Sequence, residues 1–474
     1  MNLPNLNEAR RRTNNGFNKE LYKFDNDYKD IGLNKKYYLK TYGCQMNEHD
    51  SENICGLLEE MNYSKTDSME DADLIILNTC SIRENAHNKA FGMLGRIKHL
   101  KEELKGRKDI MVALCGCMAQ EEVVVEEIMN KYKYVDFVFG THNLYDLPKL
   151  IKESENNKKT KIEVYSIEGD VIEDLPVRRD YKHKAYVNII YGCDKFCTYC
   201  IVPYTRGSQR SREMDDIIKE VNELVKDGYQ EVTLLGQNVN AYGKDLNKGY
   251  DLADLLIKVS ETKIPRIRFV TSHPWDFTDK MIEVIESYPN IMPYVHLPLQ
   301  SGSDRILKLM GRRYTSEDYK KLYDKLRKIP NISLTTDIIV GFPGETEDDF
   351  NETLKMVNYC KYDGAFTFIY SPRVGTPAAK LFEKDDTKLE VKEERLYKLN
   401  NLVNDYSLTN NQKLIGKVVK VLVDGISNKE NQLCGYTENN KLVNFSGNKD
   451  LIGKIIKVKI IDAKSFSLDG ELVE

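Results

Sequence analysis

Residues 185–200, AYVNIIYGCDKFCTYC, join an apolar run to a loop with three closely spaced cysteines. The run at 185–190 predicts a buried β-strand. Cys193, Cys197 and Cys200 follow it in the spacing C-x₃-C-x₂-C, which lets one loop present three thiolates to a common centre. A structural zinc site needs four ligands, and no fourth cysteine or histidine lies within a few residues. A [4Fe–4S] cluster normally takes four cysteines, so three would leave one iron open to an outside ligand. Zinc binding and simple core packing are the alternatives.

Similar apolar runs recur along the chain, separated by helical patterns such as Asp215–Lys226 and Glu317–Arg327. The runs predict six strands, at 185–190, 231–235, 267–271, 294–297, 335–340 and 365–370. Alternating strands and helices of this kind are typical of parallel sheets. The sequence therefore predicts a partial (β/α)₆ barrel over residues 181–408.

The cysteine loop also has an aromatic residue, Tyr199, directly before its last cysteine. The motif C-x₃-C-x-aromatic-C resembles the signature of radical-SAM enzymes. This resemblance implies that the amino and carboxylate groups of S-adenosylmethionine chelate the open iron. One-electron cleavage of the cofactor's C5′–S bond would then release a 5′-deoxyadenosyl radical. The cofactor carries this chemistry, while the protein positions it and excludes competing reactions.

Three further cysteines, Cys44, Cys80 and Cys117, are far apart in the sequence. Each follows a predicted strand, the strands being Tyr37–Tyr42, Asp73–Asn78 and Ile110–Leu114, with helices predicted at Ser51–Met61 and Ile82–Leu104. If these strands are parallel neighbours, the three thiols lie at the carboxyl edge of one sheet, where α/β proteins bind ligands. The pattern alone leaves two interpretations open, a second cluster or small buried hydrophobes. Cys115 competes with Cys117 for the third position.

The sequence segments around these cysteines resemble three motifs of the methylthiotransferase N-terminal domain: YGCQMN (42–47), NTCSIRENA (78–86) and GCMAQ (116–120). In that family each motif carries one ligand of an auxiliary [4Fe–4S] cluster. The resemblance implies that Cys44, Cys80 and Cys117 hold such a cluster. The remaining cysteines, Cys55, Cys115, Cys360 and Cys434, are interpreted as packing residues.

The C-terminal stretch 409–474 has short alternating or apolar runs between Gly and Asn turns, which predicts a small all-β barrel. The four predicted strands are Val418–Val423, Gln432–Thr437, Leu442–Phe445 and Ile455–Ile461. Its segment YTENNKLVNF (436–445) resembles a TRAM domain, an RNA-binding module. The chain is thus predicted to be α/β, with an N-terminal βαβ sheet domain, a central partial barrel and a TRAM-like barrel. The predicted boundaries are a flexible polar leader at 1–34, the sheet domain at 35–153, a linker at 154–180, the radical-SAM barrel at 181–408 and the TRAM barrel at 409–474.

Three short segments resemble those of the MiaB-type branch of the methylthiotransferases: CQMN (44–47), CSIRENA (80–86) and KFCTYCIVPYTRG (195–207). That branch methylthiolates C2 of N6-(dimethylallyl)adenosine next to the tRNA anticodon. It uses one S-adenosylmethionine as methyl donor and a second as radical source. Both open irons would then face one cavity. The alternatives are methylthiolation of threonylcarbamoyladenosine or of a ribosomal-protein aspartate, and, in another class, a non-catalytic iron–sulfur or zinc RNA-binding module.

Polar residues at predicted strand ends are candidates for the cofactor or substrate site. They are Gln237, Asn238, Gln300 and Ser301, with Gly341 and Glu345 in the turn GFPGE. Basic residues near the cysteine loop are candidates for binding tRNA phosphate or the cofactor carboxylate: Arg206, Arg210, Arg212, Arg312 and Arg313. Ordinary turn hydrogen bonds and solvated salt bridges are the alternatives. His273 and Trp275 are interpreted as structural.

Composition limits the partners. The net charge is only −4, so no global positive field attracts nucleic acid, and local patches must bind any RNA. No apolar run approaches the roughly 18 residues of a membrane-spanning helix, and no signal peptide is evident. The expected protein is cytoplasmic and monomeric, with no membrane partner. It would bind the tRNA anticodon loop and accept electrons from a flavodoxin- or ferredoxin-like donor.

Overall fold

The computed structural model describes residues 2–11, 18–82, 84–106, 108–155, 159–167, 169, 171–385, 387–429 and 431–473. The chain forms two compact units. Unit 1 comprises Met1–Asp180, Tyr191–Phe196 and Cys200–Arg210, and unit 2 comprises Tyr181–Ile190, Cys197–Tyr199 and Ser211–Glu474.

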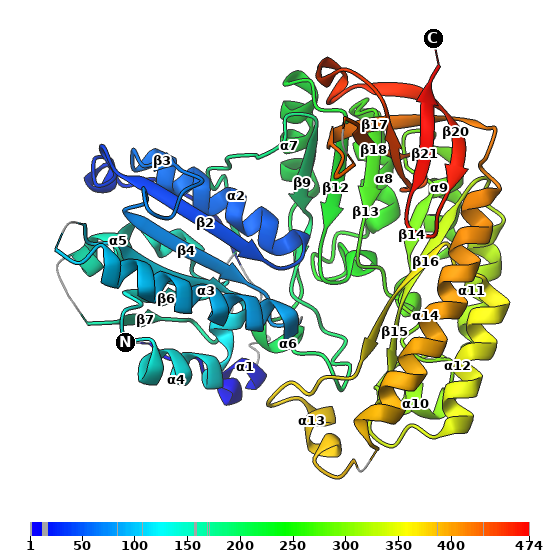
Figure 1. Ribbon diagram of the computed structural model, residues 1–474, viewed down its shortest axis with the longest axis horizontal. Coiled ribbons are helices and arrows are strands. Elements are labelled where there is room, and N and C mark those ends of the chain that lie inside the picture. Colours follow the sequence, from blue (N-terminus) through cyan, green and yellow to red (C-terminus); the bar gives the residue numbers. More distant parts are fainter. Residues whose placement is uncertain are drawn as a thin grey trace. The chain divides into compact units, whose positions relative to one another are not determined.

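Unit 1 is built on a six-stranded sheet with the order β3-β2-β4-β5-β6-β7, in which all neighbours are parallel (Figure 1). The strands are β2 (Lys36–Tyr42), β3 (Ser64–Lys65), β4 (Leu74–Thr79), β5 (Met111–Gly116), β6 (Phe137–Phe139) and β7 (Lys161–Glu163). The central strands read as continuous apolar runs because both faces of the sheet are covered. The prediction that the strands before Cys44, Cys80 and Cys117 are parallel neighbours is therefore confirmed.

Helices cover both faces of this sheet (Figure 1). Apolar residues of α3 (Glu84–Glu103) and α4 (Glu122–Lys131) pack on one face. Those of α2 (Gln45–Glu60) and α5 (Leu147–Glu155) pack on the other. Helix α2 begins six residues before the predicted start at Ser51, because Cys44 and Asn47 form a reciprocal capping box at its N-terminus.

The described parts of the predicted leader and linker have regular structure. The leader contributes α1 (Leu6–Arg11) and β1 (Lys19–Leu21), and the linker contributes β7 and β8 (Val171–Glu173). Strand β1 pairs with β8, and Leu6 and Ala9 pack on Ile201 and Tyr204. Two apolar residues three positions apart give this short helix one apolar face, which the polar composition concealed. The parts of the predicted leader at 1 and 12–17 and of the linker at 156–158, 168 and 170 lie outside the described residues.

Unit 2 contains the predicted partial barrel. Its strands form two parallel three-stranded sheets, β13-β12-β9 and β14-β15-β16, linked by a bridge between Ile267 and Ile291. The strands are β9 (Lys184–Asn188), β12 (Glu231–Leu235), β13 (Arg266–Phe269), β14 (Tyr294–His296), β15 (Ser333–Val340) and β16 (Gly364–Ile369). All six predicted strands are present, which confirms the expected fold.

Helices cover the outer side of this barrel, as Figure 1 shows for α11, α12 and α14 beside β15 and β16. The long helices are α7 (Met214–Lys226), α8 (Leu252–Glu261), α9 (Asp279–Ser287), α11 (Ser316–Arg327), α12 (Glu347–Cys360) and α14 (Leu389–Gln412). The shorter elements of the chain include β10 (Ile190–Tyr191), α6 (Val202–Thr205), β11 (Arg210–Ser211), α10 (Asp304–Leu309) and α13 (Pro377–Phe382).

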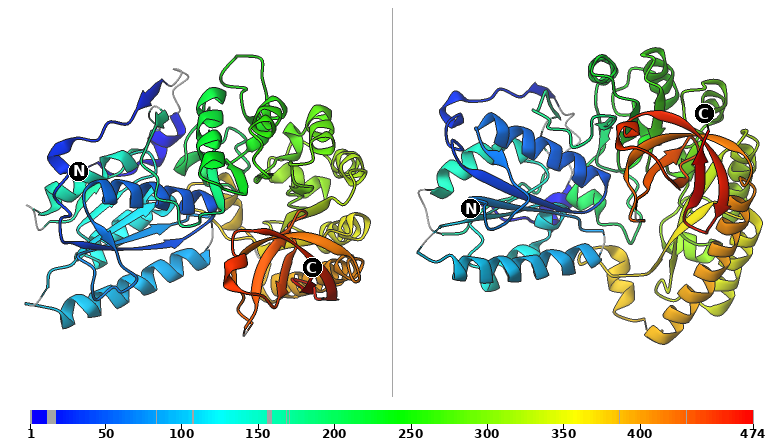
Figure 2. Two further views of the ribbon diagram at one scale, coloured as in Figure 1. Left: turned by 90° about the horizontal axis from the view of Figure 1, so that it is seen from above. Right: turned by 45° about the horizontal axis from the view of Figure 1, so that its top comes forward.

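The C-terminal segment, coloured orange to red in Figure 2, is a closed barrel. Its strand order is β17-β18-β19-β21-β20. Its strands are β17 (Val418–Ile426), β18 (Leu433–Thr437), β19 (Leu442–Phe445), β20 (Ile455–Ala463) and β21 (Leu468–Leu472). The sequence predicted four of these strands and missed β21. Within unit 2, Arg266 and Arg268 of β13 donate hydrogen bonds to the carbonyls of Tyr436 and Thr437. Among the described residues, no helix has both the length and the apolar character needed to cross a membrane.

Candidate functional site

Strand register brings Cys44, Cys80 and Cys117 to one edge of the unit 1 sheet. Tyr42 of β2 pairs with Thr79 of β4, and Thr79 pairs with Gly116 of β5. Each cysteine follows this row by one or two residues. Because adjacent strands lie about 4.8 Å apart, three thiols from three neighbouring strands converge at the carboxyl edge. Cys80 and Cys117 are buried and Cys44 is half-buried.

The three thiols interact directly. A hydrogen bond with Cys80 lowers the pKa of the Cys44 thiol, and the same bond, together with burial, raises the pKa of Cys80. Cys117 lies close enough to Cys80 for its charge to raise the pKa of that thiol, and the charge of Cys44 in turn raises the pKa of Cys117. Burial raises the pKa of Cys117, and Arg206 opposes that effect. Cys115, the competing candidate, packs with Cys55 in the apolar core on one face of this sheet. Cys360 packs in the apolar core of unit 2.

A pair of asparagines holds the strand ends that carry these cysteines. The Nδ2 of Asn47 donates to the Oδ1 of Asn78 at 3.1 Å, and the Nδ2 of Asn78 donates to the carbonyl of Asn47 at 2.9 Å. The backbone N–H of Cys44 donates to Asn47 Oδ1 at 3.4 Å. A side chain at Gly116 would collide with Asn78, since its Cβ would lie 2.3 Å from Oδ1. Sequence reasoning missed these positioning residues, although all three lie inside the cysteine motifs.

Arg206 is part of the same cluster of side chains. Its Nε donates to Cys117 Sγ at 3.1 Å, and its Nη2 donates to Asp50 Oδ2 at 2.5 Å. Burial opposes the charge of this guanidinium, but Asp50 and Cys117 outweigh the effect and raise its pKa. The sequence named Arg206 as a candidate for binding tRNA phosphate or the cofactor carboxylate. In the structure it contacts the thiol of Cys117, and one of its nitrogens is paired with the buried carboxylate of Asp50. A role toward tRNA or the cofactor stays a prediction.

The donors around the thiols suit an iron–sulfur cluster held by thiolates. Besides Arg206 on Cys117, the backbone N–H of Ile82 donates to Cys80 Sγ at 3.3 Å. N–H donors of this kind stabilise thiolate ligands and influence the reduction potential of a cluster. Within the described parts of the chain, no three Cys, His, Asp or Glu side chains are arranged to hold a metal ion. The fit therefore depends on thiol convergence and on these donors.

The loop after β10 carries Cys193, Cys197 and Cys200. The N–H of Cys193 donates to the carbonyl of Gly207 at 3.1 Å. Gly192 has φ +71°, and a Cβ there would lie 2.0 Å from the carbonyl oxygen of Ser208, so this turn requires glycine. In unit 2, the buried Arg312 donates to Cys197 Sγ at 3.4 Å. Each predicted triad therefore has an arginine on one of its sulfurs.

Buried amide groups gather at the carboxyl ends of the barrel strands. Asn188 ends β9, Asn238 follows β12, and Gln300 follows β14. Each has a buried amide oxygen without a hydrogen-bond partner in the structure as described, and Asn188 has an unpaired amide nitrogen too. Unpaired buried polar atoms are rare and indicate a missing ligand or water. This arrangement supports the prediction of a cofactor site here, and it adds Asn188, which the sequence did not single out.

The other predicted residues of this edge, Ser301 and Gln237, and the amide nitrogen of Asn238 have different surroundings. Ser301 accepts a hydrogen bond from the N–H of Ser303 and contacts Thr353, which is the role expected of a turn residue. The Nδ2 of Asn238 is paired with Asp276. Gln237 is half-buried beside Asn238. Their roles toward a cofactor remain predictions.

The turn after β15 is held by Glu345. Its Oε2 accepts hydrogen bonds from the N–H of Gly341 at 2.7 Å and from Arg395 Nη1 at 3.0 Å. Burial raises the pKa of Glu345 to about 7, against the opposing effects of Gly341 and Arg395. Its other oxygen, Oε1, is buried without a partner in the described structure. Glu345 thus holds the turn, and only Oε1 remains for a cofactor.

Substituting Gly341 tests how tightly this turn is packed. Gly341 has φ +67°, and its Cβ would lie 2.6 Å from Cγ of Lys392, a buried side chain that is paired with Asp385 at 2.6 Å. Gly344 has φ +78° but no atom within 4 Å of its Cβ position. We expect Gly344→Ala to cost about 1 kcal/mol and Gly341→Ala about 1–3 kcal/mol more, measured by urea denaturation. Equal losses for the two variants would contradict the packing described here.

The remaining predicted arginines have separate environments. In unit 1, Arg210 donates to the carbonyls of Gly169 and Arg206. In unit 2, Arg212 donates to the carbonyl of Asn188 and to Glu220. Arg313 is exposed and lies over the ring of Trp275 at 5.9 Å. Of the five predicted arginines, Arg313 alone has an exposed side chain. A contact with tRNA phosphate requires such exposure.

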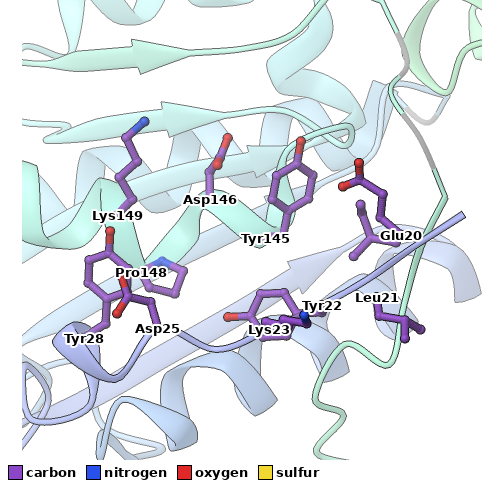
Figure 3. Close-up of a pocket in the computed structure, with 11 residues that line it drawn as sticks. Glu20, Leu21, Tyr22, Lys23, Asp25, Tyr28, Tyr145, Asp146, Pro148 and Lys149 are labelled. Carbon is purple, nitrogen blue, oxygen red and sulfur yellow. The ribbon is translucent and has the colours of Figure 1, made fainter. Parts of the chain in front are cut away.

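A pocket of about 280 Å³ lies elsewhere in unit 1, between the leader and α5 (Figure 3). Its lining includes Tyr22, Lys23, Asp25, Asp146 and Lys149. The lining contains both acidic and basic side chains, so it favours neither an anion nor a cation. None of the predicted site residues lines it.

Comparison with known proteins identifies three regions. Residues 187–357 match the Radical SAM superfamily, residues 36–140 match the uncharacterized protein family UPF0004, and residues 412–473 match the TRAM domain. A tRNA-2-methylthio-N(6)-dimethylallyladenosine synthase of Bacillus cytotoxicus is 54% identical over 480 residues, covering 99% of this chain and 92% of the relative. The chain belongs to this synthase family. The synthase of Staphylococcus epidermidis is 52% identical over 476 residues, covering 99% and 91%. The resemblance inferred from the cysteine motifs is confirmed.

Solved structures support the fold of this synthase-family chain. TsrM from Kitasatospora setae, a radical S-adenosylmethionine methyltransferase solved with cobalamin and a [4Fe–4S] cluster, superposes with a TM-score of 0.53. The alignment covers 73% of this chain and 74% of that chain, at 13% identity. This likeness shows a shared fold.

Proposed function

We propose that this protein methylthiolates C2 of N6-(dimethylallyl)adenosine next to the anticodon of tRNA, giving 2-methylthio-N6-(dimethylallyl)adenosine. Two S-adenosylmethionine molecules would be used per turnover, one as methyl donor and one as radical source. The observation that carries this proposal is the convergence of Cys44, Cys80 and Cys117 at one sheet edge, in a chain with a second cysteine triad. A radical-SAM enzyme needs only the second triad, so another cluster accounts for the first.

Each group of residues has a role in this reaction. Cys193, Cys197 and Cys200 would hold the radical-SAM [4Fe–4S] cluster, and Cys44, Cys80 and Cys117 the auxiliary one. When bound, the clusters would supply the electron that cleaves S-adenosylmethionine and a position for the sulfur that enters the base. Asn47 and Asn78 hold the auxiliary thiols in place, while Arg206 and Arg312 donate to ligand sulfurs. Asn188, Asn238 and Gln300 offer unpaired amide oxygens to the cofactor.

The partners follow from the substrate. The TRAM barrel is the proposed contact to tRNA, and anticodon loops display unstacked bases that a protein can read. A flavodoxin- or ferredoxin-like protein is the proposed electron donor, since cleavage of the cofactor consumes an electron. We also propose that the protein acts as a monomer in the cytoplasm, where tRNA is found and thiols stay reduced.

The names of the relatives favour this substrate over the alternatives. They specify dimethylallyladenosine in tRNA, and not threonylcarbamoyladenosine or a ribosomal-protein aspartate. A non-catalytic RNA-binding module would have no use for two triads that each leave an iron open.

Nucleoside mass spectrometry of tRNA tests the proposal. Cells lacking this gene, and any second such enzyme, should accumulate N6-(dimethylallyl)adenosine and lose its 2-methylthio derivative. A plasmid carrying the wild-type gene should restore the product. Persistence of the methylthio product in the deletion strain would refute the substrate assignment.

A further inference from the structure

The strand β15 separates two environments in the second half of the barrel. Leu334, Ile338 and Val340 are fully buried among the helices of the outer side. Thr335, Asp337 and Ile339 alternate with them and are only half-buried. Because successive side chains of a strand point to opposite faces, these three residues lie on the inner, concave face.

The neighbouring strand β16 continues this pattern with large apolar side chains on the concave face. Ala365 and Ile369 pack on the outer core, and Thr367 hydrogen-bonds to Asn400 of α14. Phe366 and Phe368 point the other way, and they are 60% and 46% exposed. Two exposed phenylalanines side by side on a barrel strand form an apolar patch, and such patches usually mark a binding surface.

Polar groups border this patch. Register places Phe366 beside Asp337 and Phe368 beside Ile339. The ring of His296 lies edge-on to Phe366, with centroids 5.9 Å apart. His296 Nε2 is 3.2 Å from Asp337 Oδ2, and its Nδ1 is 3.0 Å from Thr335 Oγ1. The concave face thus combines an apolar surface with a hydrogen-bonded polar row.

The patch is continuous with the carboxyl edge that holds the candidate cofactor residues. The N–H of Ile339 donates to the carbonyl of Gln300, and the N–H of Gln300 donates to the carbonyl of Asp337. Gln300 therefore lies directly beside the two β15 residues that flank Phe366 and Phe368. A substrate positioned for attack at this edge would have its neighbouring substituents over β15 and β16.

We propose that Phe366, supported by Phe368, receives the dimethylallyl group of the substrate adenosine and so selects the prenylated tRNA. This inference rests on the proposed function. The dimethylallyl group is a branched five-carbon chain that neither donates nor accepts hydrogen bonds, so apolar contact is the means by which a protein can read it. Covering both the chain and the phenylalanines removes apolar surface from water. His296 and Asp337 remain available to the polar edge of the base or the ribose.

Steady-state kinetics on two tRNAs tests this inference. One carries N6-(dimethylallyl)adenosine and the other unmodified adenosine at the same position. The ratio of their kcat/KM values should fall at least about tenfold in Phe366→Ala and further in Phe366→Asp. Phe366→Leu, which keeps an apolar side chain, should retain most of the preference. Formation of 5′-deoxyadenosine from S-adenosylmethionine with chemical reductant, without tRNA, should match the wild type in all three variants.

Tyr397→Ala is the matched control. Tyr397 is an exposed aromatic residue of α14, 68% exposed, and its loss should leave the ratio unchanged. If Phe366→Ala and Phe366→Asp keep the wild-type ratio, the assignment of the dimethylallyl group to this patch is wrong and the proposed function stands. If the wild-type enzyme itself fails to modify the prenylated tRNA, the proposed function and this inference both fall.

Discussion

Cys80→Ala is expected to reduce methylthiolation of tRNA more than about a hundredfold while leaving S-adenosylmethionine cleavage largely intact. Loss of an outer partner of a metal ligand already costs 10- to 100-fold, and loss of the ligand itself should cost more. Cys80 is the middle thiol of the three, hydrogen-bonded to Cys44 and close to Cys117. The radical-SAM triad is unchanged in this variant. Liquid chromatography with mass spectrometry can measure both the modified nucleoside and 5′-deoxyadenosine.

The control for this experiment is Cys55→Ala. Cys55 is another buried cysteine of unit 1, but it packs in the apolar core on the α2 side of the sheet. Its substitution should retain methylthiolation, apart from a loss of stability. Near-normal product formation by Cys80→Ala would show that this thiol does not hold a catalytic cluster.

Arg206→Ala is expected to destabilise unit 1 by about 3–5 kcal/mol, the usual cost of removing one partner of a buried ion pair. The substitution leaves the carboxylate of Asp50 buried without its guanidinium and removes the donor to Cys117 Sγ. Urea denaturation of the anaerobically purified protein measures the loss. In the loaded enzyme, the auxiliary cluster's reduction potential should become more negative, because a cation and a donor beside a ligand sulfur favour the reduced state.

A double-mutant cycle separates the ion pair from other effects of Arg206. Arg206→Met and Asp50→Asn together should cost less than the sum of the single variants, because neither leaves a charge unpaired in the double variant. Additive costs, or a loss below about 1 kcal/mol for Arg206→Ala, would show that the contact contributes little.

The sequence predicted the strands of the candidate cluster site correctly, because each is an apolar run that is followed by a cysteine motif. The cysteines after β2, β4 and β5 marked one sheet edge because parallel strands end together, and the register confirmed it. Strand β21 was missed because Leu468–Leu472 contains a glycine and two acidic residues. Only Leu468 and Gly470 of this strand are buried. The leader looked flexible because its composition is polar, yet two apolar residues suffice to dock α1.

Contacts between residues far apart in the sequence explain the other features of the site that the sequence did not predict. Arg206 and Asp50 are 156 positions apart, so nothing local showed that this arginine already had a buried partner. Glu345 was predicted beside the cofactor, but its pairing with Arg395, 50 positions away, shows that it also holds the turn. The sequence placed Phe366 in the predicted strand at 365–370 but did not single it out, because only the tertiary structure shows which face of β16 is exposed.

The most direct test of the second cluster uses the Cys193→Ala/Cys197→Ala/Cys200→Ala variant, prepared anaerobically. Its iron and sulfide contents are measured, and its Mössbauer spectrum is recorded. The sheet-edge thiols of Cys44, Cys80 and Cys117 should retain about four irons per chain, with the spectrum of a [4Fe–4S] cluster. Additional replacement of these three cysteines should remove them. A triple variant that folds but holds no iron–sulfur cluster would contradict the assignment of a second cluster to this sheet edge.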